Sequence, residues 1–397
     1  MSTINDNAIT VGSARDLMKA SMKLKIETID NNPVISTLKN FGIINYEEKL
    51  NTESGTQVTI YDAPRLQGKG ATGDTDRYQL AGGLESRSRT LSIQTHSNTV
   101  KYALAGSERQ QISEFDLTAR TPQLIAQWAS CLAVSQVINQ LGGNTATSIE
   151  IPDVDSDAFT GTDELLIATG HNTALAPSAR YKALGSDGTG GITTDQAVVA
   201  ANSLTLEDFM ISREVINSTA LGVPVWDRLT KSVQGVKVDA IALVSTTGMN
   251  QLKTDATANS LTFAQFIYNG IAGGGKVPLP ANTVIYEGIA FVEIPDNLMP
   301  RGVNSSTAAP VANTRRAILC GANALDMALG KGQTMNGSTL GGFEIIMDDT
   351  HDKLNKIGYT SVNMNSGCKK IQLTGTGSNA STAYDNATYV ITHYSRS

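Results

Sequence analysis

The sequence predicts an α+β protein, and three observations carry this prediction. Residues 122–141 have apolar side chains at helical spacing over about twenty positions. Several shorter segments alternate apolar and polar residues, which is typical of strands. The strand candidates between residues 342 and 395 follow one another without helices between them, which favours antiparallel pairing. A chain of 397 residues is long enough for two or three domains.

The composition favours a protein that assembles. Hydrophobic residues make up an ordinary 40% of the chain, but charged residues reach only 17%, and Ser, Thr, Asn and 36 Gly fill the difference. Surfaces that partners cover are depleted in charge at their centres. The net charge of -6 argues against a protein that grips phosphate backbones. Because no long apolar run and no secretory signal occur, we expect a chain kept in a cytosol, with no membrane partner.

The first fifty residues are expected to form an arm. Ser13 is a candidate helix cap with Asp16 three residues later, and the Asn-Asn-Pro at 31–33 is expected to end this helix. Residues 34–50 form a short amphipathic piece with no large partner nearby in the sequence. We therefore expect residues 1–53 to pack on something other than their own chain.

A long projecting β-hairpin is predicted from the segments on either side of residues 64–85. Residues 57–63 alternate as a half-buried strand does, and a second alternating series begins near Ser88. An isolated two-stranded ribbon is marginally stable in water, so this hairpin needs a surface to lie on. The residues expected at its tip are Arg65, Lys69, Gly70, Asp74 and Asp76.

A long helix, here called the spine helix, is predicted over residues 122–141. Thr121 is its expected cap, Pro122 occupies the first turn, and Gly142 with Gly143 ends it. Its length of about 30 Å is enough to organise a domain. The side chains expected to form its core face include Leu124, Trp128, Leu132 and Ile138.

The remaining elements follow in order. Thr205, with Glu207 and Asp208 after it, is expected to open a second helix. Residues 249–255 favour a short third helix. The strand candidates are residues 239–245, 283–288, 290–296 and 315–321, followed in the C-terminal tail by 342–349, 356–365, 368–373 and 387–395.

Residues 68–73, GKGATG, match the G-x-G-x-x-G pattern of nucleotide sites. Such a site needs glycines that turn a buried strand into a helix whose N-terminus faces the phosphates. Here no helical apolar stripe follows, and Asp74 and Asp76 stand where phosphate would come. The segments that accompany the kinase variant are also absent. We predict flexible glycines in a projecting loop, and a soluble nucleotide-binding enzyme using Gly68 to Gly73 is the alternative from another class.

Residues 153–164 partly match a second motif, the calcium-binding loop. The carboxylates at loop positions one, three, five and twelve are Asp153, Asp155, Asp157 and Glu164. Ala158 replaces the glycine needed at position six, and Pro152 precedes the loop in place of a helix. The pattern favours an acidic solvated loop, and a bound divalent ion stays open as the alternative.

The other reactive residues form no motif. The histidines have no second ligand at metal-site spacing and are expected at the surface or across strands; they are His96, His171, His351 and His393. The cysteines are expected to be reduced and to act as small hydrophobes; they are Cys131, Cys320 and Cys368. Trp128 and Trp226 are interpreted as core or interface anchors. We therefore predict no catalytic residue, no metal ligand and no cofactor.

Eight sequence strings carry a resemblance to a known family by their order and spacing. They are SARDLMKASMKLKIETI, SGTQVTIYDAPRLQGKGATGD, QVINQLGG, RYKAL, VDAIALVSTTGMNQLKTD, YEGIAFVEIPD, RRAILCGANAL and DKLNKIGYTSVNMNSGCKKIQL. With them the chain resembles, over nearly its whole length, the major capsid proteins of tailed bacteriophages with the Hong Kong 97-type fold. It is most similar to the family of the N-four-like phages.

The resemblance implies a domain plan. The parts are an N-terminal arm (1–53), an extended loop that lies across a neighbouring subunit (54–104), a peripheral domain with the spine helix (105–236), an axial domain (237–343) and strands that return to the peripheral domain (344–397). Some capsids of this fold join the extended loop to a neighbour through a lysine to asparagine bond. Lys69 lies at the predicted tip, but no motif identifies its partners.

The resemblance also implies a function. Copies of the chain would assemble, as hexamers and pentamers, into the icosahedral shell that encloses the double-stranded DNA of a tailed phage, without sequence-specific DNA binding. Scaffolding, portal and decoration proteins are candidate partners. The protein would be found in the virion after assembly in the host bacterial cytoplasm. The alternative with the same fold is the shell protein of a bacterial nanocompartment, which encloses cargo enzymes.

Overall fold

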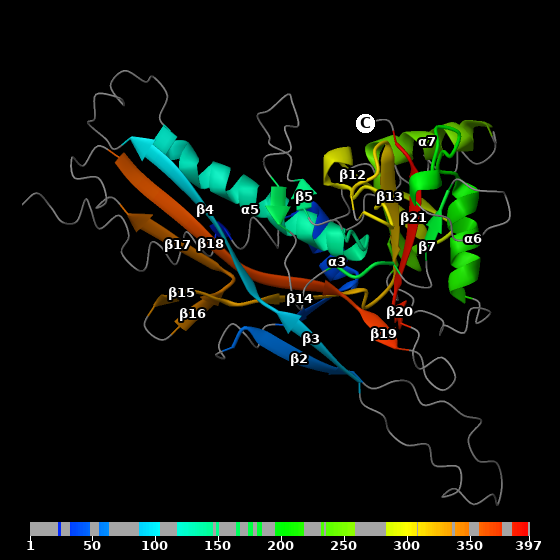
Figure 1. Cartoon of the computed structure of the whole chain (residues 1–397). Coiled ribbons are helices and arrows are strands. Elements are labelled where there is room, and N and C mark those ends of the chain that lie inside the picture. Colours follow the sequence, from blue (N-terminus) through cyan, green and yellow to red (C-terminus); the bar gives the residue numbers. More distant parts are fainter. Residues whose placement is uncertain are drawn as a thin grey trace, which may run out of the picture.

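Two β-sheets lie side by side, and the long helix α5 runs along the first sheet and ends against the second (Figure 1). A mixed α+β architecture is therefore confirmed. The computed structural model describes residues 23–24, 32–47, 55–62, 87–103, 117–145, 148–150, 164–166, 174–177, 181–184, 195–217, 232–233, 236–258, 283–307, 309–335, 338–348, 357–374 and 383–395.

The first sheet is organised by one long strand. Its members are β1 (Ile44–Glu47), β4 (Gln94–Ala103), β14 (Leu325–Leu329), β17 (Phe343–Asp348) and β18 (Ile357–Lys370). Strand β18 is antiparallel to β4 and β17 along its first part and to β14 along its last part. Strand β1 adds to the far side of β14 in parallel orientation. Segments that are far apart in the sequence are thus brought together along β18.

The second sheet has six strands in the order β11-β12-β10-β13-β21-β7. They are β7 (Tyr181–Ala183), β10 (Ala240–Ser245), β11 (Val284–Tyr286), β12 (Ile289–Ile294), β13 (Thr314–Cys320) and β21 (Thr388–Tyr394). The pairs β10–β12 and β21–β7 are parallel, and the others are antiparallel. All residues of β10 and β13 are buried, as expected for central strands that are covered on both faces.

Short pairs and turns complete the described secondary structure. The two-stranded pairs are β2 (Gln57–Asp62) with β3 (Arg87–Ser92), β5 (Ser148–Glu150) with β6 (Glu164–Leu166), β8 (Ser232–Val233) with β9 (Val236–Lys237), β15 (Lys331–Met335) with β16 (Ser338–Gly341), and β19 (Gln372–Thr374) with β20 (Ala383–Asp385). The 3₁₀ turns are η3 (Asp195–Ala197) and η4 (Asp296–Leu298).

The spine helix α5 spans Leu117–Leu141. The predicted start at Thr121 is wrong, because the helix begins earlier and Pro122 lies inside it. Proline indicates a helix start because it lacks the N–H that interior residues donate, and inside a helix it costs about 3 kcal/mol, which the other contacts of this 25-residue helix offset. The predicted end is confirmed: Gly143 has φ 62°, and the amide of Asn144 donates to the carbonyl of Asn139 at 3.0 Å.

Helix α3 (Pro33–Asn40) begins at this Asn-Asn-Pro, and residues 25–31, where the predicted helix would end, lie outside the described part of the chain. The side-chain oxygen of Asn32 accepts hydrogen bonds from the amides of Val34 and Ile35, at 3.0 and 3.2 Å. Asn32 is therefore an N-cap, and Pro33 occupies the first helical position, where its missing N–H costs nothing. The same three letters fit either end of a helix, and the apolar residues that follow decide between the two.

Residues 32–47 belong to the hydrophobic core, so the expectation that they pack outside their own chain is wrong. The buried side chains here are Val34, Ile35, Leu38, Phe41, Ile43 and Ile44. Helix α3 contacts α5, and β1 pairs with β14 from Ile44↔Leu325 onward. The partner strand lies about 280 residues further along the chain, which explains why no partner was visible near the segment in the sequence.

Helices α6 (Leu206–Asn217) and α7 (Thr246–Ala258) lie beside the second sheet (Figure 1). The predicted cap of α6 is confirmed: the Asp208 carboxylate accepts from the Thr205 amide at 3.0 Å, and the Thr205 hydroxyl oxygen accepts from the Asp208 amide at 3.4 Å. Helix α7 starts three residues before the predicted segment, because Ser245 caps the amide of Gly248.

The burial of α3 predicts a stability effect that an external arm would not show. Leu38→Ala, at a side chain with 0% exposure, should lower the free energy of unfolding by about 2–5 kcal/mol because it leaves a cavity in the core. Urea denaturation of the unassembled subunit measures this. The control Asn40→Ala, at an exposed position of the same helix, should stay within about 0.5 kcal/mol of the parent. Equal effects of the two substitutions would contradict the buried position of α3.

Candidate functional site

The β2–β3 hairpin is the described part of the predicted extended loop. Six residue pairs join its strands, from Gln57↔Ser92 to Asp62↔Arg87. Strand β3 contacts β14 and β18, on the face of the first sheet opposite to α5 (Figure 1). Strand β4 then leaves the hairpin and pairs with β18 over ten residues, so the last part of the predicted loop belongs to the main sheet. The predicted tip residues lie outside the described part of the chain; they are Arg65, Lys69, Gly70, Asp74 and Asp76.

One ion pair anchors this hairpin to the sheet. The guanidinium of Arg89 on β3 contacts both carboxylate oxygens of Asp326 on β14, one through Nε and the other through Nη2 at 3.1 Å. Asn45 on β1 donates to the same carboxylate at 2.9 Å. The Asp326 side chain is only 3% exposed, so it depends on these donors to offset its lost hydration. Burial also lowers the pKa of the neighbouring Lys369, and the Asp326 carboxylate partly opposes this.

The outer strand of the hairpin is an open edge within the described residues. Strand β2 pairs there with β3 only. The side chains of Gln57 and Thr59 are exposed, and Tyr61 is 75% exposed. A strand edge with unpaired backbone groups is a template for pairing with another chain. The hairpin therefore offers backbone hydrogen bonds and one large aromatic side chain to a partner.

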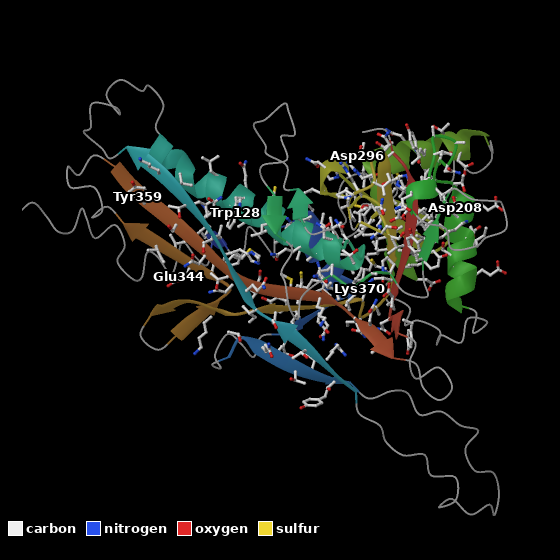
Figure 2. The ribbon with its side chains drawn as sticks, viewed as in Figure 1. Trp128, Asp208, Asp296, Glu344, Tyr359 and Lys370 are labelled. Carbon is white, nitrogen blue, oxygen red and sulfur yellow. The ribbon has the colours of Figure 1, made fainter. Side chains whose placement is uncertain are left out.

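The face of the first sheet opposite to α5 is a ladder of neutral polar side chains. Three hydrogen-bonded pairs bridge β4 and β18: Thr95 with Asn365 at 2.6 Å, Ser97 with Asn363 at 2.7 Å, and Thr99 with Ser361 at 2.8 Å. Figure 2 labels Tyr359 and Glu344 on this sheet; Glu344 accepts from Asn363 at 3.1 Å. Because strand side chains alternate between faces, Val362 and Met364 point the other way and are buried.

The side chains predicted for the core face of α5 are buried toward the C-terminal end of the helix and exposed near its N-terminal end. Leu132 and Ile138 have 0% exposure, and Trp128 is partly buried against the core. Leu124 is 45% exposed, so its assignment to the core is wrong for the single chain. Leu124 lies near the N-terminal end of α5, far from the second sheet, where fewer elements cover the helix. It adds an apolar side chain to the exposed surface.

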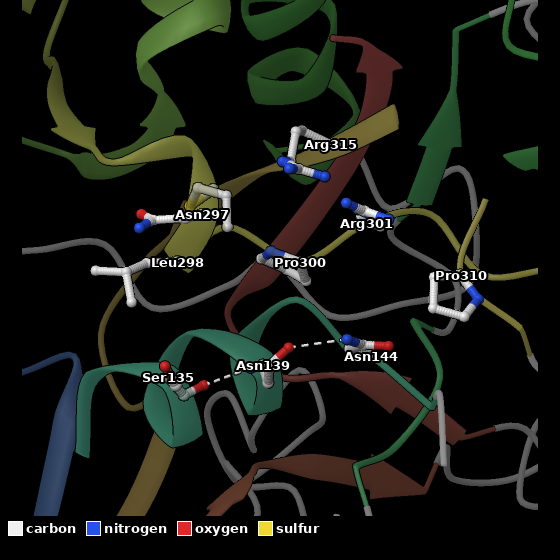
Figure 3. Close-up of a pocket in the computed structure, with 10 residues that line it drawn as sticks. Ser135, Asn139, Asn144, Asn297, Leu298, Pro300, Arg301, Pro310 and Arg315 are labelled. Carbon is white, nitrogen blue, oxygen red and sulfur yellow. Dashed lines mark hydrogen bonds between the residues drawn. The ribbon is translucent and has the colours of Figure 1, made fainter. Parts of the chain in front are cut away.

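A small polar cavity lies where α5 ends (Figure 3). Ser135, Asn139 and Asn144 line one side, and Pro300 and Arg315 are among the residues opposite. Its volume of about 40 Å³ has room for about three water molecules. Pockets that bind small molecules usually measure about 300–1,000 Å³, so this cavity does not suit a nucleotide or a similar substrate.

Two of the four histidines, His96 and His393, lie in the described part of the chain, and their environments differ. His96 lies 2.8 Å from the amide nitrogen of Gln136, and burial lowers its pKa. His393 is fully buried, which corrects the expected surface position, although it does lie across from Arg315 in a strand pair. Burial lowers the pKa of His393 to about 4. His171 and His351 lie outside the described residues.

The cysteines are free thiols, as predicted. Burial raises the pKa of the Cys368 thiol to about 12 and shifts those of Cys131 and Cys320 in the same direction. A thiol needs a lowered pKa to act as a nucleophile, so the environments of these three suit structural residues.

The other predicted motifs stay untested. The described residues contain no group of three His, Cys, Asp or Glu side chains that could hold a metal ion. Glu164 begins β6, and Asp153, Asp155 and Asp157 lie outside the description, as do Gly68 to Gly73 and Trp226. Within the described ranges, no helix has both the length and the apolar character needed to cross a membrane.

Sequence reasoning missed the anchor residues of the hairpin. Asp326 stands inside LDMAL, a strand that is otherwise apolar and fully buried. A carboxylate in such a strand needs a cationic partner, and this was the available signal. Arg316 gives the same signal inside the buried strand TRRAILC.

Comparison with known proteins gives one family. A family model described as phage capsid protein matches residues 8–397. No curated protein matched significantly.

Several solved structures share the fold. The capsid of Ralstonia phage GP4 is similar with a TM-score of 0.67 at 14% identity, over 91% of this chain and 89% of that one. The cyanophage Pam1 capsid has a TM-score of 0.58 at 17% identity, over 89% of this chain and 90% of that one. The head structure of Helicobacter pylori bacteriophage KHP40 has a TM-score of 0.56 at 14% identity, over 91% of this chain and 90% of that one. These similarities show that the chain has the Hong Kong 97-type fold.

The anchor of the hairpin predicts a local effect. Arg89→Met removes the guanidinium from a buried carboxylate and should lower the free energy of unfolding by about 3 kcal/mol. Hydrogen exchange of the unassembled subunit should speed up most in β2 and β3. The control Arg213→Met removes a more exposed partner of Asp239, with a 35% exposed side chain, and should cost less than about 1 kcal/mol. Unchanged exchange in β2 and β3 of the Arg89 variant would refute the anchor.

The burial of His393 predicts acid sensitivity. Its neutral ring contacts the Tyr394 carbonyl through Nδ1 at 3.0 Å, and Asp296, Arg315 and Asp208 are the nearby charges. Because the folded pKa is about 4 and the unfolded value is 6.5, stability is complete above pH 6.5 and is lost as the pH falls toward 4.

The loss over this interval is about 3 kcal/mol, from about 1.4 kcal/mol per pH unit. Denaturant unfolding at half-unit steps of pH measures it. His393→Gln should flatten the curve between pH 6.5 and 4, and a variant with the parent's slope would show that another group causes the effect.

Proposed function

Because the chain belongs to the phage capsid protein family, we propose that it is the major capsid protein of a tailed phage, whose copies assemble as hexamers and pentamers into the icosahedral head shell. The observation that carries this proposal is the family match over residues 8–397 together with the shared fold. The shell encloses the double-stranded DNA genome and holds it without sequence-specific contacts. The net charge of -6 supports this, because an acidic protein does not grip DNA tightly.

The exposed surfaces support assembly through neighbouring subunits. The open edge of β2 and the polar face of β4 and β18 are different patches of one chain. Contacts between different patches are head-to-tail, and such contacts propagate into rings and closed shells. A subunit that several neighbours hold at once is retained firmly even if each contact is weak.

The domain plan is part of the proposal. Residues 54–104 form the extended loop, and the segment beyond β2 and β3 reaches a neighbouring subunit. Residues 105–236 and 344–397 form the peripheral domain, and residues 237–343 form the axial domain around the symmetry axes. Residues 1–53 form the arm, although its described part, residues 32–47, is buried in the same chain. Lys69 and the other tip residues would contact the neighbour.

The proposed role is structural. The protein has no catalytic step and needs no cofactor, and its place is the virion after assembly in the host cytoplasm. Scaffolding, portal and decoration proteins are proposed partners. The nanocompartment shell is the alternative with the same fold, and the contents of the particle distinguish them: DNA supports a phage head, and a cargo enzyme supports a nanocompartment. Saturable nucleotide binding that Gly70→Ala abolishes would support the enzyme alternative instead.

Electron microscopy with sedimentation of the purified chain tests the proposal first. We expect round shells, rings of five or six subunits, or open sheets, with amounts that rise with protein concentration. A single small oligomer at every concentration would overturn the proposal. A change of the products on adding calcium would favour a metal role for the loop at 153–164.

Deletion of residues 66–82 tests the role of the extended loop. The deleted segment lies between β2 and β3, so the hairpin base and its Arg89 anchor remain. The shortened chain should keep the circular dichroism and unfolding midpoint of the parent, and it should fail to close shells. Normal shells from this variant would show that the loop is not required.

A further inference from the structure

The two sheets are joined by a narrow neck of chain. Strand β13 of the second sheet continues into β14 of the first through residues 321–324. Beside it runs the return connection from β18 to β21. Backbone hydrogen bonds tie the two connections together: Gly321 donates to Ala387 at 2.8 Å, and Ile371 donates to Ala324 at 3.0 Å. Residues 321–324 form a turn with Asn323 at φ 55°, so few backbone bonds of this neck fix the angle between the sheets.

The end of α5 makes a second connection. Helix α5 packs along the first sheet, where Gln136 accepts from Ser366 at 3.4 Å and Gln140 accepts from the Lys370 amide at 3.5 Å. At its C-terminus, Arg316 on β13 of the second sheet donates from Nη1 to the carbonyls of Gly142 and Gly143, both at 2.8 Å. A cation at this end of a helix meets the unpaired carbonyls and the negative end of the helix dipole.

The guanidinium of Arg316 is itself fixed to the second sheet. Its Nη2 donates to Asp195 at 2.7 Å, and the side chains of the pair are 4% and 2% exposed. The Asp195 carboxylate also accepts from the amide of Val303 at 2.6 Å and from the hydroxyl of Tyr181 on β7. Strand β7, the loop at Val303 and Arg316 of β13 therefore all bond to the Asp195 carboxylate.

At the end of α5, two glycines let the helix backbone lie close to neighbouring segments. A Cβ on Gly142 would lie 2.7 Å from Pro300, and a Cβ on Gly143 would lie 2.7 Å from the carbonyl oxygen of Leu175. Next to this close contact, the polar cavity of Figure 3 separates Asn139 from the chain around Pro300. Apolar side chains such as Pro300 and Ile318 pack against this side of the junction, and the bonds of Arg316 are its directional contacts.

We propose that the Asp195–Arg316 pair is a strut that fixes the angle between the two sheets and thereby the curvature of the shell that the copies build. The proposal rests on the proposed capsid function. The guanidinium is planar and rigid, so its bonds to two carbonyls and a carboxylate fix direction as well as distance. In a closed shell of hexamers and pentamers all subunits repeat similar angles, and a small change in each subunit adds up to decide whether and at what size the shell closes.

The test uses the full-length chain with Arg316→Lys. Lysine keeps the positive charge but lacks the planar guanidinium with its several N–H donors. The ion pair with Asp195 can therefore persist without fixing the relative orientation of the groups it joins. We expect a folded chain whose assemblies lose the single diameter of the parent and appear as several diameters, tubes or open sheets in cryo-electron microscopy. The control is Lys182→Met, which removes an ion pair of 2.8 Å between β7 and α6, within the second sheet's own layer. The control should keep the parent diameter.

A distance measurement on unassembled subunits tests whether Arg316 fixes the angle between the sheets, independently of shell assembly. Spin labels at Gln127→Cys on α5 and Glu207→Cys on α6, both exposed positions, report the relation of the two sheets in a Cys131→Ser background. Arg316→Lys should broaden or shift this distance, and Lys182→Met should not. Asp195→Asn provides the second variant if the lysine variant does not fold.

The outcomes are distinct. Shells of the parent diameter together with an unchanged label distance in the Arg316 variant would overturn the strut. If the parent chain forms no shell, the proposed capsid function fails, and the label distance still decides whether Arg316 fixes the angle between the sheets.

Discussion

The length of a single strand constrains the whole structure. With fourteen residues, β18 is long enough to pair with β4 and β17 at one end and with β14 at the other. A shorter strand would leave these three as separate fragments. The alternation of β18 also separates two environments, because one face carries Val362 and Met364 under α5 while the other carries the polar ladder. The spine helix therefore depends on β18 for its buried surface, and the hairpin depends on it for a support.

Charged side chains are buried where elements meet. Arg89 and Asp326 join the hairpin to the sheet, Arg316 and Asp195 join α5 to the second sheet, and Lys370 pairs with Asp385 beside the neck, with both side chains at 0% exposure. Burial lowers the pKa of Lys370, and its partner opposes this shift. Buried ion pairs add little net stability, since desolvation offsets their attraction, but they accept few alternative geometries. Their positions suggest that the chain uses them to define how its parts are oriented.

Local signals in the sequence predicted local structure well. The caps at Thr205 and Gly143 lie where expected, because capping is decided by a few neighbouring residues. The errors concern distant partners. Residues 32–47 pair with β14 about 280 positions away, β4 joins the main sheet through β18, and Leu124 is 45% exposed although its spacing matches the core residues of α5. The anchor of the candidate contact surface was missed for the same reason: Asp326 and Arg89 are 237 residues apart, and only the folded sheet brings them together.

The polar ladder on β4 and β18 has one further consequence. Its three bridging pairs are made by hydroxyl and amide groups, without a carboxylate or an ammonium group among them. Electrostatic attraction between exposed charges is screened by dissolved salt, whereas hydrogen bonding between neutral groups is not. The side-chain bonds that join β4 to β18 are therefore nearly independent of ionic strength. This part of the sheet would keep its pairing equally in dilute solution and in a concentrated cell interior.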